Sequence, residues 1–286
     1  MLDVHLSDVI CEGLQNYLAL MVHKTPVFEV NRLHFSYGRQ KVLDNISLTI
    51  EAGNFYAIVG PNGCGKTTLL DIMAGSKTPG SGSIRYLGRD IKEYGKRKLA
   101  REIALVPQDF YIHFPFTVGE VVLMGRHPYI PRFGGPSKED IDIAEAIIEK
   151  TGLCRLKDKY ITELSGGEKQ RVVFARALVQ DTPVLILDEA TSNMDIQYTL
   201  NFLKAVSEEV SQAGRTVISA LHDLNLAANY SNKMVFMKSG RIVSEGNTPE
   251  VLTEEGIKAV FNVESRVYFD RYSNSCQVSF KGIRPR

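Results

Sequence analysis

The sequence predicts an α/β fold built around a mainly parallel sheet. Strand-sized apolar runs recur along the chain, at residues 55–59, 103–106, 184–187 and 216–220. Polar or glycine-containing segments and then helical patterns follow these runs, and strands that alternate with helices form parallel sheets. Because the runs are apolar throughout, we expect these strands to be covered on both faces.

Other elements are predicted around these strands. Ile46, Leu48 and Ile50 alternate with polar residues, which is the pattern of a half-buried strand. Helical periods dominate between about residues 108 and 180, and this stretch is interpreted as a helical insertion. Its clearest helices are 118–124 and 141–148, separated by a Pro/Gly-rich segment at 127–136. Near the C-terminus we expect a turn at Ser239-Gly240, a short helix near 249–252, and a strand pair around 266–269 and 277–280.

The composition excludes several classes of protein. The 286 residues suit one large domain, or a domain with an inserted subdomain. With 44% hydrophobic and 23% charged residues, the chain does not resemble disordered, collagen-like or coiled-coil proteins. Its formal net charge of +1 provides no global electrostatic attraction to nucleic acid, so no nucleic-acid partner is expected.

Apolar runs and cysteines indicate a cytoplasmic protein. The longest apolar runs are far below the roughly 18 to 20 residues of a membrane-spanning helix. The N-terminus carries Asp3, Asp8 and Glu12, unlike a secretory signal. The four cysteines are widely separated and form no C-x-x-C pair, so neither a disulfide framework nor a zinc site is indicated. We therefore expect the reducing environment of the cytoplasm.

Residues 1–24 are treated as a separate N-terminal extension. Apolar residues at helical spacing, among them Leu6, Ile10 and Leu14, fit an amphipathic helix on a partner or a membrane surface. Alternatively, translation starts at Met21, just before the first strand. Both interpretations stay open.

A phosphate-binding loop is the most informative motif. Residues 60–67 match G-x-x-x-x-G-K-[ST], directly follow the apolar run 55–59, and precede a helical pattern at Thr68. Glycines allow backbone N–H groups to surround phosphate oxygens at a helix N-terminus. Lys66 is expected to neutralise the β- and γ-phosphates, and the Thr67 hydroxyl to bind Mg²⁺. The predicted nucleotide contacts here are Gly60, Pro61, Asn62, Gly63, Cys64, Gly65, Lys66, Thr67 and Thr68.

A carboxylate pair complements this loop. Asp188 and Glu189 follow the apolar run 184–187, and ligands of open α/β sheets bind at the carboxyl ends of the strands. We expect Asp188 to bind Mg²⁺ and Glu189 to polarise the water that attacks the γ-phosphate. An isolated Asp-Glu pair is commonly only a solvated turn, but the phosphate loop in the same chain favours the catalytic interpretation.

A third motif resembles one particular family. Residues 164–171, Leu-Ser-Gly-Gly-Glu-Lys-Gln-Arg, closely resemble the signature motif of ATP-binding cassette (ABC) ATPases, and the resemblance covers residues 27 to 260. It implies an ABC cassette of the P-loop NTPase class, with a mainly parallel core sheet, an antiparallel β subdomain and the inserted helical subdomain. The implied ATP-binding domain is 25–262, followed by a β tail at 263–286. Glu168 departs from the glutamine that many members carry, at a position that varies within the family.

The resemblance also implies a homodimer of cassettes. ATP would be held between the phosphate loop of one subunit and the signature, Ser165, Gly166, Gly167 and Glu168, of the other. Asp195 matches the residue that acts across that interface, and Tyr37 the aromatic that stacks on adenine. Gln108 matches the glutamine that contacts Mg²⁺ and the attacking water. His222 matches the histidine that contacts the γ-phosphate.

These motifs imply an ATPase subunit of an ABC transporter at the cytoplasmic face of the inner membrane, where it is peripheral. Residues 117–129 resemble importers of iron–siderophore complexes, haem and cobalamin. The implied partners are two transmembrane permease subunits and, indirectly, an extracytoplasmic substrate-binding protein. We expect the region 118–124 to pack within the insertion, and in addition to receive a permease segment.

Several alternatives are weighed against this function. The cassette could serve another cargo, such as a metal ion or an oxyanion, or an exporter. A nucleic-acid ATPase of the same family would usually carry two cassettes or long coiled coils, and this chain shows one set of motifs and no sustained heptads. A P-loop kinase would leave Ser165–Glu168 and His222 without a role.

Overall fold

The computed structural model describes residues 26–108, 110, 112, 114–192 and 194–282. The alternatives for residues 1–24 concern a segment outside these residues. Within the described part of the chain, no helix combines the length and the apolar character needed to span a bilayer.

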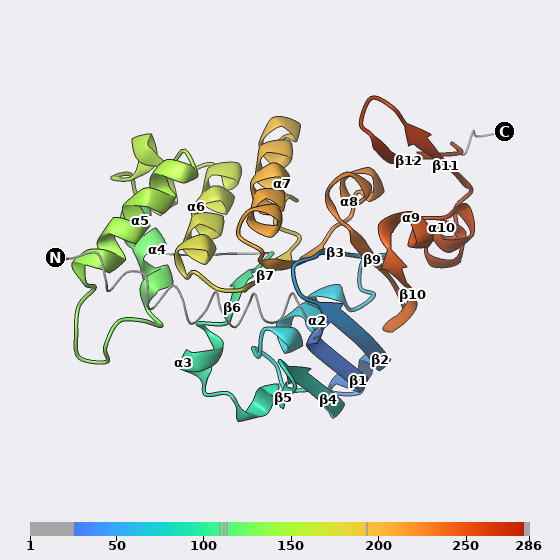
Figure 1. The fold of residues 1–286 in the computed structure, drawn as a ribbon, viewed down its shortest axis with the longest axis horizontal. Helices are drawn as coiled ribbons and strands as arrows, with labels where there is room; N and C mark the ends of the chain where they lie inside the picture. The colour runs from blue at the N-terminus through green and yellow to red at the C-terminus, as the bar shows by residue number, and fades with distance from the viewer. Residues whose placement is uncertain (1–25, 109, 111, 113, 193, 283–286) are drawn as a thin grey trace.

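A six-stranded sheet forms the centre of the fold, in the order β10-β9-β3-β8-β7-β6 (Figure 1). Five of these strands run parallel, and only β10, at one edge, is antiparallel to its neighbour. The prediction of a mainly parallel sheet is therefore confirmed. Its strands are β3 (Phe55–Val59), β6 (Ile103–Val106), β7 (Val184–Asp188), β8 (Thr216–Ala220), β9 (Lys233–Lys238) and β10 (Arg241–Asn247).

Both faces of this sheet are covered, as the apolar runs predicted. Side chains of a strand alternate between its faces. In β3, Tyr56 and Ile58 belong to one hydrophobic cluster, whereas Phe55, Ala57 and Val59 belong to another on the opposite face. All five side chains of β3 are buried.

On one face, helix α2 (Lys66–Met73) packs in one hydrophobic cluster with the core sheet and a second, antiparallel sheet. The second sheet has the order β2-β1-β4-β5. The predicted alternation of Ile46, Leu48 and Ile50 lies in β2, where all three are buried. The strands of this sheet are β1 (Pro26–Tyr37), β2 (Gln40–Glu51), β4 (Ser81–Tyr86) and β5 (Arg89–Asp90).

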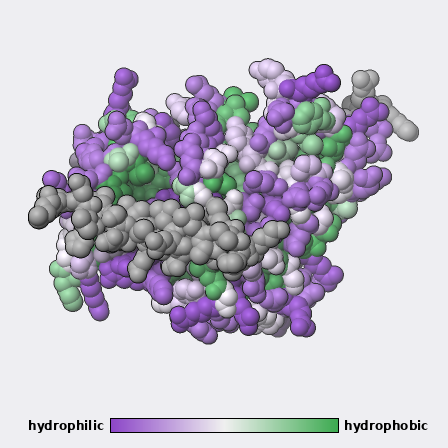
Figure 2. Space-filling view, in the orientation of Figure 1, coloured by the Kyte–Doolittle hydropathy of each residue, from purple (hydrophilic) through white to green (hydrophobic). Residues whose placement is uncertain are grey.

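The helices between β6 and β7 pack around a hydrophobic cluster of their own. They are α4 (Val118–Leu123), α5 (Lys138–Lys150) and α6 (Gly166–Val179), and both predicted helices, 118–124 and 141–148, fall on α4 and α5. Helix α6 belongs to two clusters, since Val172 packs in the insertion and Val173 packs toward the core sheet. Figure 2 shows a mostly hydrophilic face, with apolar side chains gathered over α4 and α5.

A buried ion pair holds the insertion together. Arg126 and Asp140 are 7% and 6% exposed, and Arg126 Nε donates to Asp140 Oδ1 at 2.8 Å. Arg126 Nη1 also donates to the carbonyl of Val179, at the end of α6. Burial alone would raise the pKa of Asp140, but hydrogen bonds from Arg126 and Ser137 hold this pKa below its usual value. The pair joins the segment after α4 to both α5 and α6.

Helices α7, α8, α9 and α10 contribute side chains to the hydrophobic cluster on the second face of the core sheet. Strands β11 and β12 pair as an antiparallel hairpin, which confirms the predicted strand pair. This hairpin packs on α8. Ser239 and Gly240 form the predicted turn between β9 and β10. The elements are α3 (Lys96–Leu99), α7 (Ile196–Ser211), α8 (Leu224–Tyr230), α9 (Thr248–Val251), α10 (Glu254–Phe261), β11 (Ser265–Asp270), β12 (Ser275–Phe280) and the 3-10 helices Ile91–Glu93, Met124–Arg126, Cys154–Leu156 and Ile161–Glu163.

Candidate functional site

The phosphate loop connects β3 to α2 in a tightly confined turn. Gly63 and Gly65 have φ angles of 75° and 105°, which residues other than glycine rarely adopt. A Cβ on Gly60 would lie 2.2 Å from the carbonyl oxygen of Met237 in β9. The backbone of the loop can therefore pass this close to the neighbouring strand only with glycine at position 60. Helix α2 begins at Lys66, two residues before the predicted start at Thr68.

The side chain of Lys66 is held over the loop by hydrogen bonds to backbone carbonyls of the loop. Its side-chain Nζ donates to the carbonyls of Gly60 at 3.0 Å and Pro61 at 3.4 Å, and the residue is only 4% exposed. An ammonium group in this position places positive charge beside the N-terminus of α2, where the helix dipole also favours anions.

Thr67 and Asp188 meet across the site. Thr67 Oγ1 donates to Asp188 Oδ1 at 3.2 Å. Burial, together with the smaller effects of the negative charges of Glu189 and Asp71, raises the pKa of Asp188 to about 6, although Thr67 and Lys66 act to lower it. A cation placed between these oxygens would favour the ionised carboxylate.

Glu189 faces both the phosphate loop and His222. Its Oε1 lies 2.6 Å from His222 Nε2 and 3.7 Å from Lys66 Nζ. Glu189 has a φ of 49°, a conformation that a residue other than glycine seldom adopts, and such strain is concentrated at functional sites. The turn after β7 thus directs the carboxylate back over the ends of the strands.

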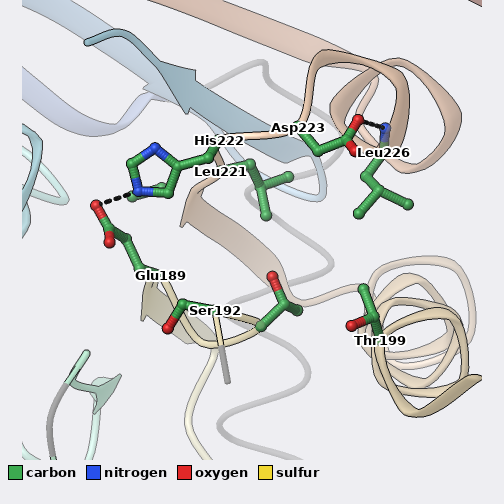
Figure 3. Close-up of a pocket in the computed structure, with 9 residues that line it drawn as sticks. Glu189, Ser192, Thr199, Leu221, His222, Asp223 and Leu226 are labelled. Atoms are coloured by element: carbon green, nitrogen blue, oxygen red, sulfur yellow. Dashed lines mark hydrogen bonds and ion pairs between the residues drawn. The ribbon is translucent and has the colours of Figure 1, made fainter. Parts of the chain in front are cut away.

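A pocket of about 190 Å³ opens beside Glu189 and His222 (Figure 3). It lies between the turn that follows β7, the start of α7 and the segment from β8 into α8. Its polar lining consists of Glu189, Thr191, Ser192, Thr199, His222 and Asp223. Asp223 caps α8, accepting hydrogen bonds from the backbone N–H groups of Asn225 and Leu226.

The signature segment lies apart from this cluster. Ser165 caps α6 in a capping box: its Oγ donates to Glu168 Oε2 at 2.7 Å, and its backbone N–H donates to the same oxygen at 2.9 Å. These hydrogen bonds hold the pKa of Glu168 below its usual value. Among the described residues, no hydrogen bond or ion pair joins Ser165, Gly166, Gly167 or Glu168 to Lys66, Thr67, Asp188, Glu189 or His222.

Among the described residues, no hydrogen bond or ion pair joins three other predicted site residues to this cluster. Tyr37 ends β1 with half of its surface exposed, and Lys77 Nζ lies 5.8 Å from its ring centroid. Gln108 follows β6 and is partly buried. Asp195 caps α7, accepting a hydrogen bond from the backbone N–H of Tyr198 at 2.9 Å.

Sequence reasoning missed the pocket residues Thr191, Thr199 and Asp223. Asp223 had a recognisable signal, because an aspartate before a helical pattern is a common N-cap. Thr199 had none, since a threonine within a helix shows from the sequence neither which way it faces nor what it meets.

Comparison with known proteins identifies the family of this chain. Residues 43–192 match the family model described as ABC transporter. The chain belongs to the ABC transporter family.

Two curated members of this family are similar over most of the chain. The cobalamin import ATP-binding protein BtuD of Halobacterium salinarum is 38% identical over 251 residues, which cover 88% of this chain and 63% of that protein. The ferric enterobactin transport ATP-binding protein FepC of Escherichia coli is 35% identical, over 84% of this chain and 88% of that protein.

Solved ABC structures share the fold. A chain from an inward-facing structure, described as a metal-chelate type ABC transporter, has a TM-score of 0.78 and 28% identity, and covers 91% of this chain and 98% of its own. A dimeric ATP-binding cassette bound to ADP and Pi has a TM-score of 0.69 and 25% identity, over 77% of this chain and 98% of its own.

Proposed function

We propose that this chain is the ATP-hydrolysing subunit of an ABC importer for an iron–siderophore, haem or cobalamin-type metal chelate. One observation carries the ATPase proposal: Lys66, Thr67, Asp188, Glu189 and His222 converge at the carboxyl ends of three strands, β3, β7 and β8. The cargo class is supported by the names of two similar proteins, a cobalamin import protein and a ferric enterobactin transport protein.

The convergent residues suit a nucleotide triphosphate. The loop Gly60–Thr67 and the following Thr68 would bind the phosphates through backbone N–H groups, with Lys66 supplying positive charge. Thr67 and Asp188 provide hard oxygen atoms 3.2 Å apart, a donor set that fits Mg²⁺. Gln108, at the end of the neighbouring strand β6, would be a third ligand. When bound, Mg²⁺ neutralises charge that develops on the β- and γ-phosphate oxygens.

Glu189 is proposed to act as the general base. Its carboxylate lies within ion-pair distance of Lys66, so it faces the position of the phosphates, and it would accept the proton of the attacking water. His222, whose Nε2 lies 2.6 Å from the same carboxylate oxygen, would orient Glu189 and contact the γ-phosphate. Gln108 would position the attacking water.

The separation of the signature from the phosphate loop supports a homodimer. Ser165, Gly166, Gly167 and Glu168 form a second anion-binding helix terminus, away from the first, and would bind the nucleotide of a partner subunit. Asp195 would contact the partner, and Tyr37 would stack on adenine. The dimeric cassette with ADP and Pi is consistent with this arrangement.

The insertion is proposed to bind the permease. Val118, Val121 and Val122 are buried in the cluster of the insertion, so they pack internally. Exposed side chains nearby, including Phe114 at 70% and Tyr160 at 46%, leave an apolar surface for a permease segment. Two permease subunits and, indirectly, an extracytoplasmic substrate-binding protein complete the proposed importer. The chain would lie peripherally on the cytoplasmic face of the inner membrane.

The proposed domain organisation is an ATP-binding domain at 25–262, with the insertion at about 108–180 and a β tail at 263–286. The tail residues of β12 pack on α8, next to the segment that carries His222. This contact supports the proposal that the tail stabilises the position of α8 beside the ATP site.

The decisive experiment replaces Glu189 by Gln. We expect the purified Glu189→Gln protein to bind ATP, to lose at least 99% of the wild-type hydrolysis rate, and to elute as a dimer with ATP in size-exclusion chromatography with light scattering. Glu255→Gln, an exposed glutamate on α10, is the matched control and should hydrolyse ATP at the wild-type rate. Wild-type turnover by Glu189→Gln would contradict the assigned base.

A further inference from the structure

The side chain of His222 is only partly enclosed by the fold. It is 40% exposed, and its Nε2 lies 2.6 Å from Glu189 Oε1 (Figure 3). Because neighbouring side chains enclose it only in part, its position depends on the backbone on either side. On one side, Leu221 is buried, and its backbone N–H donates to the carbonyl of Ile58 in β3. On the other side, the backbone enters α8 through the N-cap Asp223.

Helix α8 is too short to be stable without support from the rest of the fold. It has seven residues, and isolated helices of fewer than about 12 residues are only marginally stable in water. Leu224 and Ala227 pack in the hydrophobic cluster on one face of the core sheet. Residues three positions apart lie on the same side of a helix, so another side of α8 remains for a second support.

Strand β12 provides this second support, and it lies beside α8 (Figure 1). Asn225 and Asn229, one helical turn apart on α8, both hydrogen-bond to β12. Asn225 Oδ1 accepts from the backbone N–H of Val278 at 2.6 Å, and Asn225 Nδ2 donates to the carbonyl of Val278 at 3.4 Å. Asn229 Oδ1 accepts from Gln277 Nε2 at 3.0 Å and from Ser275 Oγ. The amide of Asn225 therefore pairs with both backbone groups of one strand residue.

The hairpin can support α8 because it is also attached to the core. Val267 of β11 lies opposite Val278 of β12. The backbone N–H of Val267 donates to Glu254 Oε1 of α10 at 3.2 Å. Helix α10 packs in the cluster of the core sheet through Ile257. The hairpin thus bridges α8 and α10.

We propose that the C-terminal hairpin positions His222 for ATP hydrolysis, and that Asn225 is the residue that transmits this support. The proposal rests on the role of His222 given above. The connection is short, because the backbone N–H of Asn225 donates to Asp223 Oδ1 at 2.8 Å, and Asp223 directly follows His222 in the chain. Without the hydrogen bonds to β12, the start of α8 would shift and His222 would move away from Glu189. Asn225 is a positioning residue, because it acts through His222.

Asn225→Ala tests the proposal in the full chain. Alanine is a strong helix former, so this variant removes the hydrogen bonds to β12 without weakening α8 itself. We expect kcat for ATP hydrolysis to fall at least fivefold, but by no more than in His222→Ala. KM for ATP should change less than twofold, because the phosphate loop is untouched. Asn225→Asp keeps the acceptor for the N–H of Val278 and should retain more than half of the wild-type rate.

A double mutant separates the positioning of His222 from a general structural effect. We expect Asn225→Ala to lower the single-turnover rate of the His222→Ala protein less than twofold, because the residue that it positions is already absent. A further fivefold loss would overturn the proposal, and so would a folded Asn225→Ala protein with kcat within twofold of wild type. An Asn225→Asp protein as slow as Asn225→Ala would exclude the hydrogen bond to Val278 as the cause.

Glu264→Gln is the matched control within the hairpin. It breaks the exposed ion pair with Lys281, at 2.7 Å, which does not involve α8, and it should keep the wild-type kcat. A loss equal to that of Asn225→Ala would show that any damage to the hairpin lowers the rate, and would remove the specific role of Asn225.

Asn229→Ala provides a second test if Asn225→Ala does not fold. It removes the other attachment of α8 to β12, and should lower kcat at least twofold with KM unchanged. An unchanged kcat in Asn229→Ala would then overturn the proposal. If His222→Ala itself retained wild-type turnover, the role of His222 and that of the hairpin would both be wrong. Normal dependence on His222 with a neutral Asn225→Ala would contradict the hairpin alone.

Discussion

Thr67 Oγ1 donates a hydrogen bond to Asp188 Oδ1 at 3.2 Å, although the two residues are 121 positions apart in the sequence. Strand β8 separates β3 from β7 in the sheet, and α2 packs on β7 and so carries Thr67 across this gap. The contact therefore depends on the crossover geometry of the whole sheet. It also brings together the two oxygen donors proposed for Mg²⁺.

Thr67→Ala tests this pair of donors. Removing the hydroxyl leaves Asp188 as the remaining donor of the pair, so we expect the Mg²⁺ concentration for half-maximal ATP hydrolysis to rise at least tenfold. Thr67→Ser keeps the hydroxyl and should need Mg²⁺ at the wild-type concentration. The measurement is a Mg²⁺ titration of the ATPase rate, and an unchanged requirement in Thr67→Ala would exclude the hydroxyl as a ligand.

Lys66→Ala should weaken ATP binding. A hydrogen bond to a charged group contributes about 1.5–3 kcal/mol, so Kd for ATP is expected to increase about 10- to 150-fold. Fluorescence titration with an ATP analogue measures this change directly. Lys204→Ala, an exposed lysine on α7, serves as the control and should bind as the wild type does. Equal affinities of the two variants would remove Lys66 from the phosphate site.

Gly60→Ala should destabilise the fold itself. The added Cβ would lie 2.2 Å from a backbone oxygen in β9, so strands β3 and β9 would have to move apart. We expect a loss of more than about 2 kcal/mol in the free energy of unfolding, measured by urea denaturation. Gly95→Ala is the control, because nothing lies within 4 Å of a Cβ there. A Gly60→Ala protein as stable as Gly95→Ala would show that the loop is less confined than these distances indicate.

Asp140→Asn should have a pH-dependent cost in stability. The pKa of Asp140 is lowered in the folded protein from an ordinary value of 3.8, although burial acts against this, because Arg126 and Ser137 stabilise the carboxylate. Its stabilisation is therefore present above about pH 4, and is lost as pH falls through the folded pKa. At pH 7 we expect Asp140→Asn to lose about 3 kcal/mol.

Urea unfolding at pH 7, 5 and 3.5 measures this dependence. The difference between Asp140→Asn and wild type should persist at pH 5 and shrink at pH 3.5. Asp142→Asn, an exposed residue on the same helix, should differ little from wild type at any of these values. A difference that grows as pH falls would contradict the assigned sign.

The strands of the core sheet were predictable because their apolar runs are local and unambiguous. Phe55–Val59, Ile103–Val106 and Thr216–Ala220 have the predicted bounds, and β7 extends one residue further, to Asp188. Strand β4 was not predicted, since Ser81–Tyr86 contains two serines and a glycine and acquires its strand structure by pairing with β1. Tertiary pairing overrode weak local preference there.

The sequence by itself determined the phosphate loop, the carboxylate pair and the residue types of the site, because these motifs are contiguous and lie at strand ends. Only the tertiary structure decided that His222 contacts Glu189, that Lys66 lies within ion-pair distance of the same carboxylate, and that Thr199 lines a pocket beside them. These contacts join segments that the sheet order places side by side. Because strand order is set by packing over the whole chain, it cannot be inferred from the individual motifs.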